Sequence, residues 1–186
     1  MNNAAKVVAL TLAVLVIGGW SNKPKGTSYE PVSDKLPTLT VSFSDSLWDG
    51  KKIPKGQQCS RDSGNANTPP LRVENIPEGV NAIIVEFNDE SYQPLSYAGG
   101  HGKIGFWTNG KSSIDLPPQP AETKNLNDGA WVEAPDRGFN GTAYLPPCSG
   151  GRGNFYSAEV KAVYKNNDPN GKSKLYAKGY IGIGRW

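Results

Sequence analysis

Apolar and polar residues alternate with a period of two along several stretches of this chain, which predicts β-strands. Leu39, Val41 and Phe43 alternate with Thr and Ser, the pattern of a half-buried strand. Residues 82–87 form a nearly continuous apolar run, which is typical of a buried strand. Residues 103–107 predict another strand, which follows a glycine-rich segment.

The C-terminal part predicts two strands joined by a tight turn. Alternating residues over 156–164 and again over 175–183 flank the Asp-Pro-Asn-Gly sequence of residues 168–171, a strong turn signal. Beyond the N-terminal region, helical spacing is never kept for more than a turn or two. We therefore expect a mainly β fold, a sandwich of antiparallel sheets with long Gly/Pro-rich loops and little helix.

Length and charge narrow the class of protein. The 186 residues fit a single domain, and the 22 Gly and 15 Pro indicate many turns. A net charge of +3, with basic residues scattered along the chain, gives no support for nucleic-acid binding.

The N-terminus has the composition of a targeting segment. Lys6 precedes an apolar run over residues 7–17, too short to span a bilayer comfortably but suited to secretion. We expect residues 1–21 to be a signal peptide, or an uncleaved anchor that would then be the only membrane contact. Residues 22–37 read as a linker and residues 38–186 as the domain, which is expected to be periplasmic or secreted.

The order of several motifs resembles a known family. An Ile-Pro pair at Ile53 is followed by Cys59, then by Asn-Thr-Pro-Pro-Leu at residues 67–71. Ile-Pro-Glu-Gly at residues 76–79 leads into the apolar run described above. This order resembles the phosphatidylethanolamine-binding protein (PEBP) family, in its bacterial Raf kinase inhibitor-like branch, over about residues 43–185 with a gap. The resemblance implies a PEBP-like β-sandwich with one anion-binding pocket.

Two further segments match the family's pocket motifs in part. Asp89 matches the first Asp of an Asp-Pro-Asp-x-Pro motif whose Pro and second Asp are replaced, and His101, the single histidine, follows at the family's spacing. Tyr156 matches the last position of a Gly-x-His-Arg-Tyr motif, in which Asn154 and Phe155 replace His and Arg. Asn cannot become a cation, so we expect weaker and less pH-dependent anion binding than in the family.

The resemblance also implies roles for these residues. Asp89 is expected to orient His101 by accepting a hydrogen bond from one ring nitrogen. The other nitrogen and the backbone N–H groups of residues 99–102 are expected to face a small anionic or phosphate-bearing ligand. The expected ligand-binding residues are Asp89, Gly100, His101, Gly102, Asn154 and Tyr156.

The chain has two cysteines, Cys59 and Cys148, each in a Gly/Pro-rich loop and neither in a Cys-x-x-Cys motif. Some bacterial proteins that resemble this chain carry cysteines at both loop positions. In an exported protein we expect them to form a disulfide. No metal site and no cofactor are expected.

Two functions remain open at this stage. The first is a non-catalytic binding protein with a pocket for phosphate or a phospholipid headgroup-type anion. The alternative is a protein-interaction or inhibitor module that keeps the fold, has lost the ligand, and contacts a protein partner through residues 112–153. An enzyme is not expected, because the chain has one histidine and no Gly-x-Ser-x-Gly motif.

Overall fold

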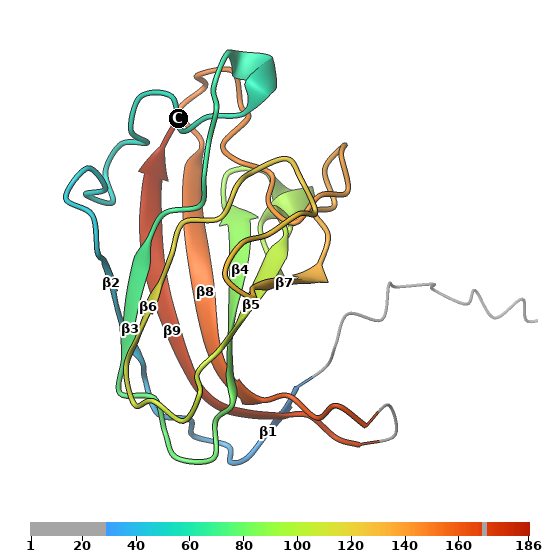
Figure 1. The fold of residues 1–186 in the computed structure, drawn as a ribbon. Helices are drawn as coiled ribbons and strands as arrows, with labels where there is room; N and C mark the ends of the chain where they lie inside the picture. Colours follow the sequence, from blue (N-terminus) through green and yellow to red (C-terminus); the bar gives the residue numbers. More distant parts are fainter. Residues whose placement is uncertain (1–28, 169–170) are drawn as a thin grey trace, which may run out of the picture.

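The computed structural model describes residues 29–168 and 171–186, whose strands form two sheets packed face to face (Figure 1). The larger sheet has the order β1-β9-β8-β4-β5-β7, and the smaller has the order β2-β3-β6. The strands are β1 (Glu30–Pro31), β2 (Thr40–Phe43), β3 (Leu71–Glu74), β4 (Ala82–Asp89), β5 (Lys103–Trp107), β6 (Ile114–Leu116), β7 (Trp131–Ala134), β8 (Phe155–Tyr164) and β9 (Lys174–Arg185).

The prediction of a mainly β fold is confirmed. Helical geometry in the described residues is limited to two short 3-10 turns, η1 (Ser60–Asp62) and η2 (Gln93–Leu95). Over the same residues, no helix is long and apolar enough to cross a bilayer. All strand pairs are antiparallel except β1 with β9.

The central strand β4 is buried along its whole length, as its apolar sequence predicts. Ile83, Val85 and Phe87 face the core between the two sheets. Ala82 and Ile84 point to the opposite face, where they belong to a second, smaller apolar cluster. Both faces of this strand therefore exclude water, which explains the continuous apolar run.

Residues 29–37 differ from the expectation of a linker. Within this segment β1 pairs with the start of β9, and the Tyr29 hydroxyl donates a hydrogen bond of 2.7 Å to Glu133. Tyr29 and Leu36 pack on the smaller apolar cluster, so their apolar surface is the reason that the segment joins the sheet. The expected signal peptide, and the linker up to residue 28, lie outside the described residues.

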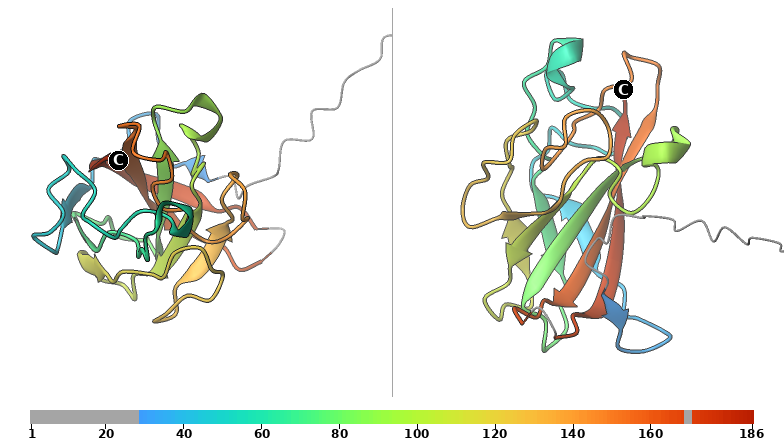
Figure 2. Two further views of the ribbon diagram at one scale, coloured as in Figure 1. Left: turned by 90° about the horizontal axis from the view of Figure 1, so that it is seen from above. Right: turned by 90° about the vertical axis from the view of Figure 1, so that its right-hand side faces the viewer.

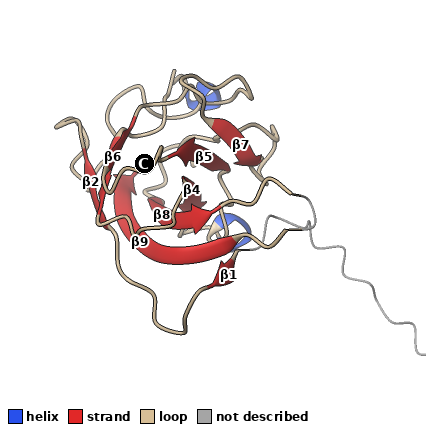
Figure 3. Cartoon of the chain, turned by 60° about the horizontal axis from the view of Figure 1, so that its bottom comes forward, coloured by secondary structure: helices blue, strands red, loops and turns tan. Residues whose placement is uncertain are grey.

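The predicted C-terminal strand pair is present as β8 and β9, which pair from Tyr164 opposite Lys174 to Phe155 opposite Arg185. Residues 169–170 of the expected turn lie outside the described residues. The pair carries two bulges, and β9 curves strongly around the core (Figure 3). Gly179 permits close packing here, since a Cβ atom at this position would lie 2.6 Å from Val41 of the smaller sheet.

The segment 112–153 contains two short strands, β6 and β7, for which no strand was predicted. The remainder of it runs beside the end of the larger sheet where β4 ends and β8 begins (Figure 2). The predicted disulfide between Cys59 and Cys148 is present and ties this segment to the loop that carries η1. These loops form the end of the molecule that holds the candidate site.

Candidate anion-binding site

Strand register brings the expected site residues to one end of the larger sheet. Asp89, the last residue of β4, lies directly opposite Tyr156 near the start of β8. His101 lies two residues before β5, and its backbone N–H donates a 2.9 Å hydrogen bond to the carbonyl of Phe87 in β4. Three strand ends therefore converge at one point.

A cavity of about 350 Å³ opens at this point. Four of the six expected ligand-binding residues line it: Asp89, His101, Asn154 and Tyr156. Asp89, His101 and Tyr156 are each less than 5% exposed, and together with Leu145 and Cys148 we call them the cavity floor. The structure thus brings together residues of the two expected motifs, of which Asp89 and Asn154, 65 positions apart, are joined by a hydrogen bond.

The ring of His101 is held by the protein backbone. Its Nδ1 lies 2.7 Å from the carbonyl oxygen of Leu145, and its ring meets that of Tyr156 edge-on at 5.4 Å between centroids. A carbonyl oxygen only accepts, so Nδ1 carries the hydrogen. Burial lowers the pKa of His101, and the Leu145 bond and the charges of Asp89 and Asp136 only partly oppose this.

The expectation that Asp89 orients His101 is therefore wrong, because Leu145 takes that role. The carboxylate of Asp89 has other partners. Its Oδ1 accepts the N–H of Ser91 at 3.0 Å, and its Oδ2 accepts the side-chain amide of Asn154 at 2.7 Å. Asn154 was expected to face a ligand. It lines the cavity, but its side-chain amide donates to Asp89.

Gly100 and Gly102 do not offer their N–H groups to a ligand, contrary to the prediction. The N–H of Gly100 donates to the side-chain oxygen of Asn88, and that of Gly102 to the carbonyl of Gly99. Their role is steric, since a Cβ atom would lie 2.2 Å from the Leu95 backbone at Gly100 and 2.1 Å from the Ala143 backbone at Gly102. Both glycines allow these backbones to pack beside the histidine.

Tyr156 and the disulfide form one side of the floor. The Tyr156 hydroxyl accepts a 3.3 Å hydrogen bond from the N–H of Cys148, and burial, with the charge of Asp89, raises the pKa of Tyr156 to about 12. Its hydroxyl is therefore protonated near neutral pH. Asp62 lies beside the two cysteines, but their sulfurs are bonded to each other and are not thiolate ligands for a metal.

Three arginines that the sequence analysis did not single out also line the cavity: Arg61, Arg137 and Arg152. They come from η1, from the segment after β7, and from the loop before β8. They are far apart in the sequence and only the fold brings them together, so no local pattern reveals them. We call these three residues, with Tyr92 and Phe139, the cavity rim.

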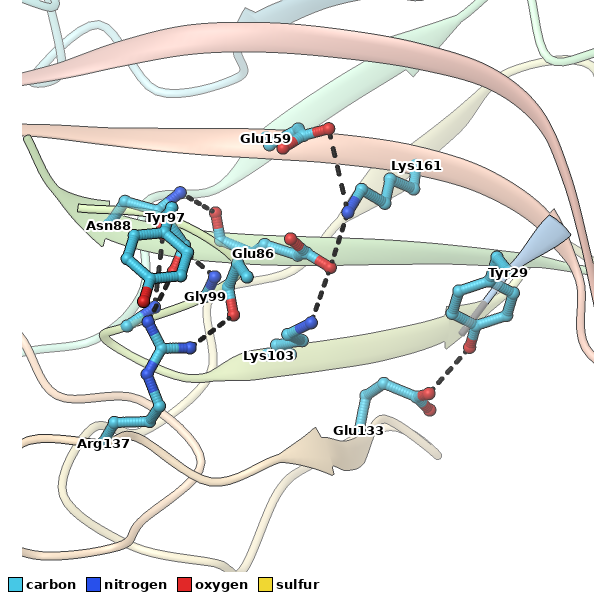
Figure 4. A network of polar contacts seen from close by, with 12 residues as sticks. Tyr29, Glu86, Asn88, Tyr97, Gly99, Lys103, Glu133, Arg137, Glu159 and Lys161 are labelled. Atoms are coloured by element: carbon cyan, nitrogen blue, oxygen red, sulfur yellow. Dashed lines mark hydrogen bonds and ion pairs between the residues drawn. The ribbon is translucent and has the colours of Figure 1, made fainter. Parts of the chain in front are cut away.

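Two of the three rim arginines, Arg61 and Arg137, are held mainly by carbonyl oxygens rather than by carboxylates. Arg137 donates to the carbonyls of Tyr97 at 2.7 Å and Ala98 at 3.0 Å, as Figure 4 shows in part. Arg61 donates to the carbonyl of Cys148, and its closest carboxylate, that of Asp62, is 3.8 Å away. Bonds to carbonyls fix these groups in place without neutralising their charge.

Arg152 is exposed and makes no hydrogen bond or ion pair within residues 29–168 and 171–186. Tyr92 and Phe139 are each more than half exposed, and the Arg61 guanidinium lies 5.0 Å from the centre of the Phe139 ring. The residues that line the cavity include three guanidinium groups and one carboxylate, that of Asp89. Asp62, 3.8 Å from Arg61, offsets part of the positive charge, and the balance stays positive. This arrangement suits an anion that carries an apolar group, because aromatic side chains lie beside the arginines.

A second hollow, of about 420 Å³, lies elsewhere on the molecule and is lined by residues including Glu159, Lys178 and Tyr180. Close to it, Glu86 forms a buried ion-pair network with Lys103 and Lys161 on β4, β5 and β8 (Figure 4). The carboxylates of Glu86 and Glu159 pair with the lysines of this region, which are Lys103, Lys161 and Lys178. The region therefore lacks the uncompensated cations of the first cavity.

No known family model and no curated protein matches this sequence. Among solved structures, the chain is similar to a crystal structure from Chlamydia trachomatis described as a homologue of phosphatidylethanolamine-binding protein. The TM-score is 0.49 at 15% sequence identity, and the match covers 80% of this chain and 97% of the other.

Proposed function

We propose that this protein is a PEBP-like binding protein whose cavity takes a small oxyanion, either free phosphate or a phospholipid headgroup-type phosphate. One observation carries the proposal: a cavity of about 350 Å³ has a buried histidine at its floor and three arginines at its rim. Guanidinium groups bind phosphate oxygens with two parallel hydrogen bonds, which makes arginine the common residue for such ligands.

The proposal is for binding without catalysis. The one imidazole of the chain bonds a carbonyl through Nδ1 rather than a carboxylate, and both cysteines are in a disulfide. A hydrolytic triad would instead need a nucleophile beside a base that a third group orients. The alternative, a protein-interaction module without a ligand, predicts that phosphate does not bind.

Isothermal titration with inorganic phosphate tests the proposal. The wild-type protein should bind phosphate, and Arg61→Gln and Arg152→Gln should each weaken binding about tenfold, the loss expected for one charge-assisted hydrogen bond. Arg72→Gln is the matched control, because Arg72 lies on the smaller sheet and pairs with Asp115. Equal affinity in all four proteins would show that binding is elsewhere, and no binding by the wild type would overturn the proposal.

We also propose that the protein is exported. The apolar run at residues 7–17 and the disulfide both support this, because disulfides form in oxidising compartments. Determining the N-terminal sequence of protein recovered from the producing cells tests it. A mature chain that starts near Asn22 is expected, and an intact chain recovered from the cytoplasm would contradict it.

A further inference from the structure

A carboxylate at the floor of a cavity for anions needs an explanation. Asp89 is 4% exposed and lines the cavity. Both of its oxygens accept hydrogen bonds from N–H groups, those of Ser91 and Asn154, which is the arrangement of an ionised carboxylate. A like charge placed against it is strongly unfavourable. An anion that enters this cavity must therefore meet Asp89 in a way that removes the repulsion.

The histidine beside it is also an acceptor. Because Nδ1 carries the hydrogen that bonds the Leu145 carbonyl, the neutral ring of His101 has a lone pair on Nε2. In the part of the chain that the structure describes, Nε2 has no hydrogen-bond partner. The floor thus presents two acceptors, an imidazole nitrogen and a carboxylate, beside one neutral donor, the Tyr156 hydroxyl, while the three guanidinium groups lie at the rim.

We propose that the cavity selects oxyanions that keep a proton, of which hydrogen phosphate is the simplest, and that Asp89 is the residue that rejects fully ionised ones. This inference rests on the proposed function and names its ligand class. The hydroxyl of the bound anion donates to Asp89 or to Nε2 of His101. Its remaining oxygens accept from Arg61, Arg137 and Arg152.

Sulfate shows why this arrangement discriminates. It has the tetrahedral shape of phosphate and can accept from the same arginines, but it carries no proton at neutral pH. Its lone pairs would face those of Asp89 across the floor, with no hydrogen between them. A site built around a ligand hydroxyl rejects analogues that lack it far more strongly than it rejects differences in size. Repulsion of the wrong ligand is a common source of such specificity.

Titration of the purified protein with inorganic phosphate and with sulfate at about pH 7 is the first test. Phosphate is expected to bind at least about tenfold more tightly, since a short O–H···O⁻ bond replaces a like-charge contact. Asp89→Asn should bring the two affinities together, mainly through a gain for sulfate. Asp34→Asn is the control, because it removes the same charge at an exposed position that does not line the cavity. The wild-type ratio tests the idea even if Asp89→Asn fails to fold.

Methyl phosphate gives an independent test through pH, because a phosphomonoester loses its second and last proton with a pKa near 6. Between about pH 6 and pH 8 we expect its affinity to fall several-fold, while inorganic phosphate, which keeps a proton, does not weaken. In a purely cationic pocket, methyl phosphate would bind more tightly as it becomes a dianion. The charged and titratable groups around the ligand are Asp89, His101, Tyr156 and the three arginines, with Asp62 beside Arg61 and Asp136 close to His101. Burial lowers the pKa of His101 and raises that of Tyr156, which favours the uncharged form of both.

The outcomes separate this inference from the proposed function. If phosphate and sulfate bind equally, or if methyl phosphate binds more tightly at the higher pH, the cavity binds anions but does not select for a proton. If neither anion binds, the proposed function fails and this inference fails with it.

Discussion

Burial and a single carbonyl set the state of the histidine in this chain. His101 is 3% exposed, and this burial favours the neutral ring, while the hydrogen bond from Nδ1 to the Leu145 carbonyl fixes which nitrogen carries the hydrogen. The nearby carboxylates of Asp89 and Asp136 favour the cation, but the effect of burial on the pKa is larger. The residue therefore acts at neutral pH as a hydrogen-bond acceptor and not as a cation.

This burial predicts a pH dependence of stability. The pKa of His101 is lower in the folded protein than the value of about 6.5 in an unfolded chain. As the pH falls below about 6.5, the unfolded chain takes up the proton first, so the free energy of unfolding decreases. Urea unfolding at several pH values should show this decrease in the wild type and a smaller one in His101→Gln. If the free energy of unfolding decreased equally with falling pH in the two proteins, the lowered pKa of His101 would be contradicted.

Glu86 is a second buried titratable residue, and its neighbours favour the charged form. Its side chain is 2% exposed, and Oε1 lies 2.9 Å from Nζ of Lys103 and 2.8 Å from Nζ of Lys161. Burial alone would raise the pKa of Glu86, but the hydrogen bonds from both lysines outweigh it and lower the pKa. The carboxylate thus joins three adjacent strands of the larger sheet through their side chains.

Removing this charge should destabilise the protein strongly. Glu86→Gln leaves two largely buried lysines without their carboxylate, and we expect it to lower the free energy of unfolding by about 3 kcal/mol. Glu74→Gln is the matched control, since Glu74 pairs with Arg72 on the surface, where such a change costs about 0–1 kcal/mol. Chemical denaturation measures both, and equal effects would show that the Glu86 network adds nothing.

At the scale of elements, the cavity rim depends on loops that the disulfide ties together. Cys59 precedes η1, which carries Arg61, and Cys148 precedes the loop that carries Arg152. The bridge joins residues 89 positions apart and so restricts a long loop in the unfolded chain. It also places two of the three rim arginines on anchored segments.

Loss of the bridge should therefore affect both stability and binding. The double variant Cys59→Ala with Cys148→Ala is expected to lose about 2–4 kcal/mol of stability. Its phosphate affinity should also fall, because the loops that hold Arg61 and Arg152 gain freedom that binding must remove. Calorimetry and titration measure the two effects on the same sample. Unchanged phosphate affinity would mean that the fold holds these loops without the disulfide.

The elements differ in how well the sequence predicts them. β4, β5, β8 and β9 were predicted because each has a long apolar run or a sustained alternation. β6 and β7 have three and four residues and lie among prolines and glycines, so they show too little of a pattern to recognise. β1 has two residues, and it forms because Tyr29 and Leu36 find an apolar surface that only the folded sheet provides.

The same distinction holds for the site. Asp89, His101 and Tyr156 were found because each adjoins a predicted strand and matches a motif position. Asn154 was found by the same motif match, but its hydrogen bond to Asp89 was not predicted. Leu145 and the rim arginines were missed, because they come from loops whose course depends on tertiary packing. Gly100 and Gly102 were given a ligand role because glycine N–H groups often bind anions, but here the surrounding chain takes up those groups.

At the scale of the whole molecule, two curved sheets enclose one core, and the loops at one end form a cavity. Hydrogen-bond acceptors lie at the cavity floor and arginines at the cavity rim. The strand order places β4 between β8 and β5. The end of β4 at Asp89 therefore lies beside Tyr156, near the start of β8, and beside His101, just before β5. The fold therefore positions the floor, while the disulfide and the loop contacts position the rim. The central claim is that an oxyanion binds between them.

Nuclear magnetic resonance of the imidazole tests this claim most directly, because the chain has a single histidine and its ring signals belong to His101. Titration with inorganic phosphate should shift the ring resonances of His101 to a saturating value, and Arg61→Gln should need more phosphate to reach it. Ring resonances that stay in place at phosphate concentrations that shift other signals of the protein would contradict the account.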